Sequence, residues 1–354
     1  MQSTILTNQL TFKTFNYLKI NESRVDIPEL EKINLEMESD KVNDILLNNF
    51  FENKNDQLPQ DVLDLNKKYN NLFKVFKTDG QDIEESIKII TSDDENQVID
   101  NHYIEAENGG KLNLIIDYEN LGNQEKFRSS LLKIHAKKAS TINLFIIQNE
   151  NISQTSLETI YLDIDEDAKV NVSQFELGAK KIYTYMQANL LGKHSELNIN
   201  SIYLGSKKDE INMLYNIFHY GKYTQSDIMV NGALQDQAKK TFKSTLDFKE
   251  GSSFSEGSEE EYVILLDDDV ESISAPVLLT HEDNVIGNHA ASAGNVDQDL
   301  MFYIMSRGFD EENAKSLIIQ SKFAGAINSI YDEEFRNMLW HKIFDIVRGT
   351  DNAK

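Results

Sequence analysis

The chain has 354 residues, 59 acidic against 35 basic side chains, and a formal net charge of −24. This length can bury a large core, while the charge repels nucleic acid and anionic lipid, which makes both poor partners. Cysteine is absent, which excludes disulfides, thiolate nucleophiles and sulfur ligation of a metal or cluster by this chain.

Residues 1–100 are predicted to form an N-terminal helical region. Ser39 and Asp40 can cap a first helix, and Pro59 precedes a second. Apolar residues recur at helical spacing in both, namely Val42, Ile45, Leu46 and Phe50, then Val62, Leu65, Tyr69, Leu72, Phe73 and Phe76. Helices with one apolar face more often pack on a neighbouring domain than carry chemistry, so this region is interpreted as a cap.

Residues 101–294 are predicted to form a β core. From about Ile104 to Val285, apolar and polar residues alternate in short segments, such as that containing Leu112, Leu114 and Ile116. Glycine-containing turn signals separate the segments. Many short strands without a long helix between them exclude a doubly wound sheet and leave a sandwich, a barrel or a β-solenoid. The strand spacing is irregular, so the alternation does not choose among these three.

Residues 295–354 are predicted to form a C-terminal helical domain. Asp297, Asp310 and Asp332 stand where three helices begin. Arg307 and Gly308 end the first helix, because glycine suits the left-handed position after a helix C-terminus.

Histidine is the chain's only soft ligand or general base, and His281 with Glu282 and His289 at first suggests a metal site. A zincin helix needs its second histidine four residues after the first, and here it comes eight residues later. One extended strand would place both histidines on one face, but Gly287 and the turn at 283–284 count against such a strand. Whether His281 and Glu282 join a site with His289 stays open.

Other catalytic templates fit poorly. No GxxxxGK[ST] loop is present and no GxGxxG follows a predicted strand, so ATP hydrolysis is not encoded here. Asp267, Asp268 and Asp269 could serve as acid and base in a glycosidase or lyase, but an acidic triplet between strands is usually a solvated turn.

Two runs near the C-terminus stand out, HEDNVIGNHAASAG at 281–294 and DQDLMFYIMSRGFDEENAKSLIIQSKFAGAI at 297–327. With an ordered set of segments from about Ile217 to Ile330, they resemble the C-terminal signature of the SufB/SufD family, the scaffold part of the SUF machinery that assembles iron–sulfur clusters. Weaker similarity covers Tyr17 to Lys19 and Lys111 to Glu119. The resemblance implies a mainly β fold, a right-handed parallel β-helix flanked by helical N- and C-terminal regions.

The chain resembles the SufD-like paralogue of that family. In the SufB type, glutamate follows the signature histidine and a cysteine in the β-helix is the proposed sulfur acceptor, whereas here Ala290 follows His289 and cysteine is absent. The resemblance implies a non-enzymatic scaffold subunit that pairs with a cysteine-bearing SufB-type subunit and docks a SufC-type ABC ATPase, with iron entry or cluster stabilisation as a further role.

The resemblance also assigns residues. His289 is implied to bind iron or the cluster, or to hydrogen-bond to it, at the partner interface. Contact with the ATPase is assigned to Phe302, Tyr303, Arg307, Gly308 and Phe323. No cofactor is expected to be held by this chain alone, and a transient iron–sulfur cluster or iron would be shared with the SufB-type partner.

The N-terminus, MQSTILTNQLTFKTF, lacks a basic region followed by an apolar run, and no 18-residue apolar stretch occurs, so a cytoplasmic protein without a membrane partner is expected. Two alternatives to the scaffold reading remain. One is a β-helix enzyme acting on polysaccharide, and the other is a homo-oligomeric scaffold that replaces both paralogues.

Overall fold

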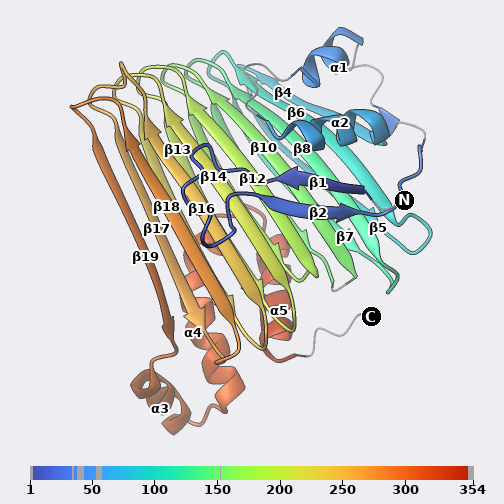
Figure 1. The fold of residues 1–354 in the computed structure, drawn as a ribbon, viewed down its shortest axis with the longest axis vertical. Helices are drawn as coiled ribbons and strands as arrows, with labels where there is room; N and C mark the ends of the chain where they lie inside the picture. Colours follow the sequence, from blue (N-terminus) through green and yellow to red (C-terminus); the bar gives the residue numbers. More distant parts are fainter. Residues whose placement is uncertain (1–2, 34–35, 38–43, 53–57, 152, 350–354) are drawn as a thin grey trace.

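The computed structural model describes residues 3–33, 36–37, 44–52, 58–151 and 153–349. The strands wind into a parallel β-solenoid made of two sheets (Figure 1). The chain alternates between the sheets, so that each coil adds one strand to each, and the strands pair in parallel. The predicted mainly β fold, a parallel β-helix, is confirmed.

Within the described residues, the first sheet has nine strands and the second has eight. The first contains β3 (Glu36–Met37), β4 (Leu72–Asp79), β6 (Gln97–Glu107), β8 (Lys126–Ala136), β10 (Gln154–Ile164), β12 (Lys181–Leu190), β14 (Glu210–His219), β16 (Lys239–Phe248) and β18 (Glu271–Thr280). The second contains β5 (Asp82–Thr91), β7 (Lys111–Asn120), β9 (Thr141–Asn149), β11 (Lys169–Leu177), β13 (Glu196–Gly205), β15 (Gln225–Leu234), β17 (Glu256–Leu265) and β19 (Ile286–Asn295).

Alternating side chains fill the space between the two sheets. Leu112, Leu114 and Ile116 of β7 are fully buried there, in one continuous apolar core with the matching residues of other coils. Each such side chain contributes about 1.5–3 kcal/mol of transfer free energy. The alternation predicted from the sequence therefore builds the interior of the solenoid.

The N-terminal elements cover the outer face of the first sheet (Figure 1). They are the antiparallel strands β1 (Ser3–Thr7) and β2 (Ser23–Ile27), with the helices α1 (Asp44–Phe50) and α2 (Gln60–Tyr69). Phe50 of α1 and Leu63 of α2 join one apolar cluster with Leu131 and Tyr185 of the sheet. This region is a cap, as expected.

The predicted boundary of the β core at residue 101 is wrong, because the long coils begin with β4 at Leu72. The second helix ends at Tyr69, and Leu72, Phe73 and Phe76 belong to β4. Phe73 packs outward against the cap and Phe76 packs in the interior. Apolar residues on both faces of a strand imitate helical spacing, which explains the error. The predicted caps Ser39 and Asp40, with Val42, lie outside the described residues.

Three helices follow the solenoid, as predicted. They are α3 (Gln298–Ser306), α4 (Glu311–Asn328) and α5 (Glu333–Val347). The carboxylates of Asp297, Asp310 and Asp332 accept hydrogen bonds from backbone N–H groups in the first turns of these helices. Gly308 has a φ of +98°, the left-handed conformation expected after α3. No helix among the described residues is long and apolar enough to cross a membrane.

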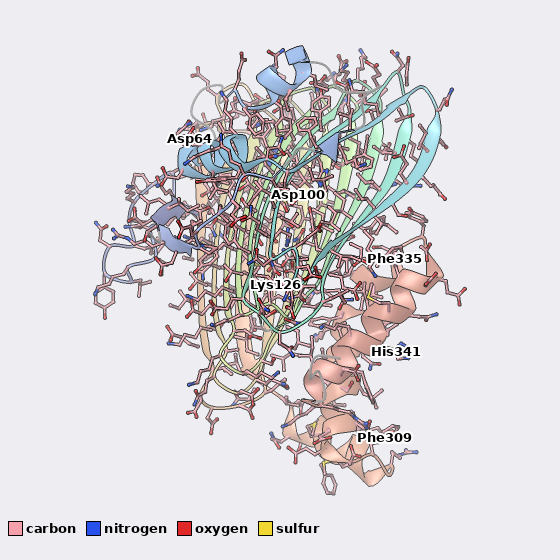
Figure 2. The ribbon with its side chains drawn as sticks, turned by 90° about the vertical axis from the view of Figure 1, so that its right-hand side faces the viewer. Asp64, Asp100, Lys126, Phe309, Phe335 and His341 are labelled. Atoms are coloured by element: carbon pink, nitrogen blue, oxygen red, sulfur yellow. The ribbon has the colours of Figure 1, made fainter. Side chains whose placement is uncertain are left out.

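The helices α4 and α5 pack on the outer face of the second sheet, opposite to the N-terminal cap (Figures 1 and 2). Ile319 and Phe323 of α4 and Ile343 of α5 share an apolar cluster with Phe175 and Ile202 of the sheet. Both outer faces of the solenoid are thus partly covered, while its C-terminal end is left open.

Candidate functional site

The strands β18 and β19 form the last coil of the solenoid, called here the end coil. Among the described strands, β18 has β16 as its one partner and β19 has β17. Figure 1 places β19 at the outer edge of its sheet. The other edge of each strand offers backbone N–H and C=O groups without a strand partner, and such an edge can accept a further strand from another protein.

His289 lies on the face of β19 that is directed toward the solenoid interior. In-register parallel strands place paired residues on one face, so the pairing defines a column of side chains. The column of His289 contains Leu114, Leu144, Val172, Ile199, Ile228 and Glu259. The first five belong to the buried apolar core. His289 itself is exposed, because it belongs to the final coil.

Glu259 of β17 is the register partner of His289. It is only 3% exposed, and its carboxylate accepts a hydrogen bond from the hydroxyl of Ser244. Burial raises the pKa of Glu259 to about 7, the Ser244 hydrogen bond opposes the rise, and the negative charge of Glu261 adds to it. A buried carboxyl with such a pKa is able to release its proton near neutral pH and to bind a cation.

A buried ion pair lies two residues further along β17. The Nζ atom of Lys240 is 2.6 Å from Oε1 of Glu261 and donates to the hydroxyl of Ser274 at 2.9 Å. The hydroxyl of Tyr203 donates to the same Glu261 oxygen at 3.2 Å. Burial lowers the pKa of Lys240, and Glu261 opposes that change. Glu261 is therefore neutralised within the chain, whereas among the described residues Glu259 has no ion-pair partner.

The structure does not join His281 and Glu282 to His289. His281 follows β18, and its Nε2 atom lies 3.6 Å from Oδ1 of Asp247 in the first sheet. The carboxylate of Glu282 accepts a hydrogen bond from the backbone of Gly251. His289 belongs to the second sheet. A turn separates the two histidines, as Gly287 and the residues at 283–284 indicated, so they do not share one strand.

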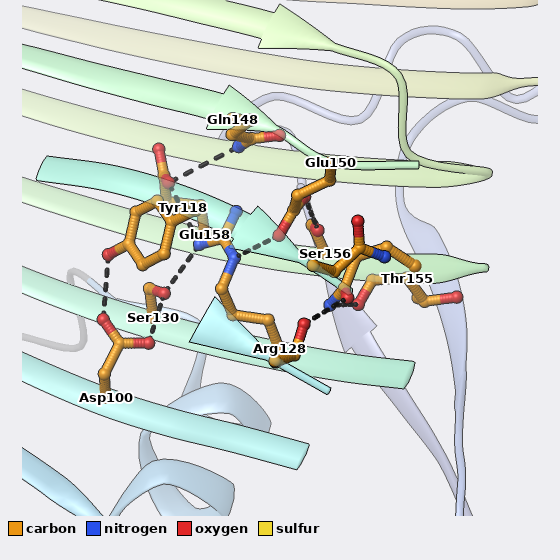
Figure 3. Close-up of polar contacts among 12 residues, drawn as sticks. Asp100, Tyr118, Arg128, Ser130, Gln148, Glu150, Thr155, Ser156 and Glu158 are labelled. Atoms are coloured by element: carbon orange, nitrogen blue, oxygen red, sulfur yellow. Dashed lines mark hydrogen bonds and ion pairs between the residues drawn. The ribbon is translucent and has the colours of Figure 1, made fainter. Parts of the chain in front are cut away.

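A second buried polar cluster lies in the earlier coils (Figure 3). Arg128 Nε is 3.0 Å from Glu150 Oε1, and Arg128 Nη1 is 3.3 Å from Glu158 Oε2. The guanidinium lies 3.7 Å from the ring centre of Tyr118, whose hydroxyl donates to Asp100. Burial lowers the pKa of Arg128, but Glu150 and Glu158 outweigh burial and raise it. This cluster pairs its cation with carboxylates of the same chain, although Arg128 Nη2 is buried without a hydrogen-bond partner among the described residues, and it is interpreted as structural.

Sequence analysis did not single out Glu259, Glu261 or Lys240. The two glutamates occupy the register positions that Ile228 and Val230 fill one coil earlier. Alignment of successive coils, at a period of about 30 residues, would reveal this exchange of apolar for acidic side chains. The irregular length of the turns hides that period in a single sequence.

The residues assigned to ATPase contact divide into exposed and buried groups. Phe302 is 77% exposed and Tyr303 is 55% exposed on α3, and Arg307 donates to the hydroxyl of Tyr303 at 3.1 Å. Gly308 follows on the same exposed end of the helix. Phe323 is fully buried between α4 and the second sheet. Its assignment to a contact is therefore corrected, because an aromatic ring in the core cannot reach a partner.

The end coil alone offers an incomplete set of metal ligands. Within the part of the chain that the structure describes, no group of three or more histidine and acidic side chains is arranged to hold a metal ion. The chain also has no cysteine. A cluster at His289 could not take thiolate ligands from this chain.

The strand pairing and the helices on both outer faces define the chain as a parallel β-solenoid protein. Residues 89–322 match the family described as "SUF system FeS cluster assembly, SufBD core domain", and this match spans more than half of the chain. The chain belongs to the SufBD family and is a SufD-like member of it. The resemblance found in the sequence is confirmed, and membership supports a role in iron–sulfur cluster assembly.

Curated relatives agree with this assignment. The iron–sulfur cluster assembly protein SufD of Bacillus subtilis (strain 168) is 30% identical over 151 residues, which cover 43% of this chain and 35% of that protein. SufD of Escherichia coli (strain K12) is 21% identical over 242 residues, which cover 68% of this chain and 57% of that protein. A SufBD family protein of Staphylococcus epidermidis is 24% identical over 191 residues, 54% of this chain and 41% of its own length. The chain therefore matches between about a third and three fifths of these relatives' lengths.

Proposed function

We propose that the chain is a non-enzymatic scaffold subunit of an iron–sulfur cluster assembly complex and pairs with a cysteine-bearing SufB-type subunit through its end coil. The observation that carries the proposal is the open edge of β18 and β19 with His289 beside it. Because this chain has no cysteine, thiolate ligands for a cluster must come from the partner. A partner strand added to this edge would bring its own residues next to His289.

Within this proposal, iron or a nascent cluster is cargo shared across the contact. His289 would bind it through a neutral imidazole nitrogen or hydrogen-bond to it, which supports iron entry or cluster stabilisation. The exposed position of His289 favours this role, since a buried imidazole could not reach a second protein. The complex would work in the cytoplasm.

The exposed side of α3 would dock a SufC-type ABC ATPase. Phe302 and Tyr303 form an exposed aromatic pair, and large exposed rings are typical of protein contacts. Arg307 lies 5.1 Å from the ring centre of Tyr303 and adds a positive charge to this surface. The helix follows β19 directly, so motion of a bound ATPase would be transmitted to the end coil.

The first test compares the wild-type chain with His289→Ala in a strain that depends on this assembly system. Affinity purification should recover an ATPase and a cysteine-bearing relative with both versions, because His289 is exposed and its loss leaves the core intact. Cluster yield, measured by visible absorption and bound iron per complex, should fall for His289→Ala.

A matched control is His341→Ala, which removes another exposed histidine, on α5, that hydrogen-bonds only to the carbonyl of Asn337 among the described residues. It should leave cluster yield unchanged. Recovery of neither partner would contradict the scaffold proposal. Full cluster yield with His289→Ala would remove His289 from the proposed chemistry.

One observation bears on the polysaccharide alternative. A groove of about 1030 Å³ is lined by lysines and by Asp209, Asp236 and Asp267 to Asp269. Asp236 accepts the backbone N–H of Lys207, and Asp267 accepts that of Asp236, which favours a role in fixing turns. A uronate lyase assay with purified chain should show no product. Light scattering with and without the cysteine-bearing subunit tests the homo-oligomeric alternative, which predicts self-association of the chain alone.

A further inference from the structure

The interior column that ends at His289 changes its chemistry one coil before the end. Five coils place apolar residues at this position, from Leu114 to Ile228, and then Glu259 and His289 follow. A polar residue such as His289 is expected on the final strand, because that strand is exposed to water. Glu259 is one strand further in and is 3% exposed, so contact with water does not account for it.

Among the described residues, the Glu259 carboxylate has fewer hydrogen-bond and ion-pair partners than the nearby carboxylate of Glu261. Glu261 has the ammonium group of Lys240 and the hydroxyls of Tyr203 and Ser274. Among the described residues, the hydroxyl of Ser244 is the one hydrogen-bond partner of Glu259, and no cationic side chain pairs with it. Burying a carboxylate without a cation is costly, and the preceding coils show that an apolar side chain fits this position.

On the open side of Glu259, strand β19 places His289 beside it as its register partner. Ala291 and Ala293 follow at the next inward positions of β19. Paired residues on neighbouring strands are separated by about 4.8 Å along the sheet, a distance that lets a carboxylate and an imidazole bind one ion. A carboxylate oxygen and an imidazole nitrogen together suit divalent transition metals, and iron is the one that the proposed function supplies.

We propose that Glu259 and His289 together are this chain's half of a divalent iron site at the end coil, completed by ligands of the cysteine-bearing subunit. Ser244 is a positioning residue, because its hydroxyl donates to one carboxylate oxygen and so directs the other. The ion neutralises Glu259, a buried carboxylate near the open end that has no cation among the described residues. This inference rests on the proposed function, since two ligands from one chain do not hold the ion alone.

The test titrates the assembled complex with Co²⁺ under anaerobic conditions, with Co²⁺ as an optical probe for the divalent iron position. Complex formation is measured first, by size-exclusion chromatography. The affinity for Co²⁺ should fall about tenfold or more in Glu259→Gln, because that change removes a ligand charge at nearly constant shape. His289→Ala should weaken binding comparably and shift the visible bands of bound Co²⁺, since a nitrogen ligand is lost.

The matched control is Glu260→Gln. Glu260 lies between Glu259 and Glu261 on β17, directed to the outer face, where its carboxylate accepts a hydrogen bond from Tyr262. This variant has the same change in net charge and should bind Co²⁺ like the wild type. If Glu259→Gln does not fold, Glu259→Asp keeps the carboxylate but withdraws it by one methylene, and it too should weaken binding.

Each outcome decides a separate question. Three outcomes would overturn the iron site and leave the scaffold proposal standing. They are wild-type affinity for Co²⁺ in Glu259→Gln, equal losses of affinity in Glu259→Gln and Glu260→Gln, and an assembled wild-type complex that takes up no Co²⁺. Failure of the wild-type chain to form the complex would overturn the scaffold proposal, and the shared site with it.

Discussion

The solenoid interior holds two groups of buried charge that differ in how the charge is balanced. Around Arg128, one guanidinium meets Glu150 and Glu158 and stacks on Tyr118. Near Glu259, the cation Lys240 is paired with Glu261. Among the described residues, Glu259 has the hydroxyl of Ser244 as its single partner. The first group has its cation in direct contact with two carboxylates of the chain. Within the described residues, the second leaves Glu259 without a cation.

The two groups of buried charge also lie at different distances from the open end of the solenoid. The Arg128 group belongs to β6, β7, β8 and β10 and is covered on both sides by further coils. Glu259 lies on β17, with one coil between it and the open end. A buried carboxyl without an internal cation can be kept neutral by a proton, as at Glu176 deep in the solenoid, or can bind a cation from outside, as proposed for Glu259 beside the open end.

The largest effect is expected from Arg128→Met. It leaves Glu150 and Glu158 buried without their cation, and breaking a buried ion pair from one side typically costs about 3–5 kcal/mol. The free energy of unfolding from urea titrations, monitored by circular dichroism, measures this loss.

Lys138→Met is the matched control, since it removes a cation from an exposed pair with Glu166. An exposed pair contributes about 0–1 kcal/mol, so little change is expected. Equal losses in both variants would mean that the Arg128 cluster is not the structural element described here.

The second prediction concerns Glu176, an interior carboxyl in β11, which lies between the two groups. Its Oε1 atom accepts a hydrogen bond from Thr184, and its Oε2 atom has no partner within the described chain. Burial raises the pKa of Glu176 from 4.5 to about 8. The folded state therefore holds this proton more tightly than the unfolded state, so its stabilising effect is complete below pH 4.5 and is lost as the pH rises through 8.

Glu176→Gln should remove that dependence, because glutamine resembles the protonated acid and does not titrate. We expect the variant to be more stable than the wild type by only about 1 kcal/mol at pH 5 and by roughly 4 kcal/mol at pH 8, where the folded wild-type carboxyl is half ionised. Urea titrations at both pH values measure the difference. A gain of the same size at pH 5 would assign the effect to packing instead of proton binding.

The sequence predicted the fold better than the site. Alternation at Leu112, Leu114 and Ile116 indicated strands, and the aspartates at 297, 310 and 332 indicated the C-terminal helices, because these signals are local. The solenoid itself came from family resemblance, since the coil period is irregular. Leu72 and Phe73 were misread because both faces of β4 are buried.

Glu259 could not be found in the same way. The role proposed for Glu259 depends on Ile228 and His289, its partners on the two neighbouring strands. Each partner lies about 30 residues away in the sequence, so no local sequence pattern connects the three. The lack of a cation at Glu259 is a property of three-dimensional packing. His289 was identified because the family signature contains it, and Phe323 was wrongly assigned because sequence does not separate a buried aromatic residue from an exposed one.

The smallest predicted effect compares one tyrosine hydroxyl in each group. Tyr118 donates to Asp100 at 2.8 Å, and Tyr203 donates to Glu261 at 3.2 Å. Replacement by phenylalanine removes one hydrogen bond to a charged acceptor, worth about 1.5–3 kcal/mol at good geometry and less when the bond is long. Tyr118→Phe should therefore lower the free energy of unfolding more than Tyr203→Phe, for which a loss of about 1 kcal/mol is expected.

Both variants keep the aromatic ring, so the packing in each group is nearly unchanged and urea titrations at one pH suffice for the comparison. A larger loss for Tyr203→Phe would mean that the group near the open end depends on its internal bonds as strongly as the Arg128 group does. That result would assign Glu261 and its partners to the fold as firmly as the Arg128 group, and the Co²⁺ titration of Glu259→Gln would then be the measurement that separates Glu259 from a structural carboxyl.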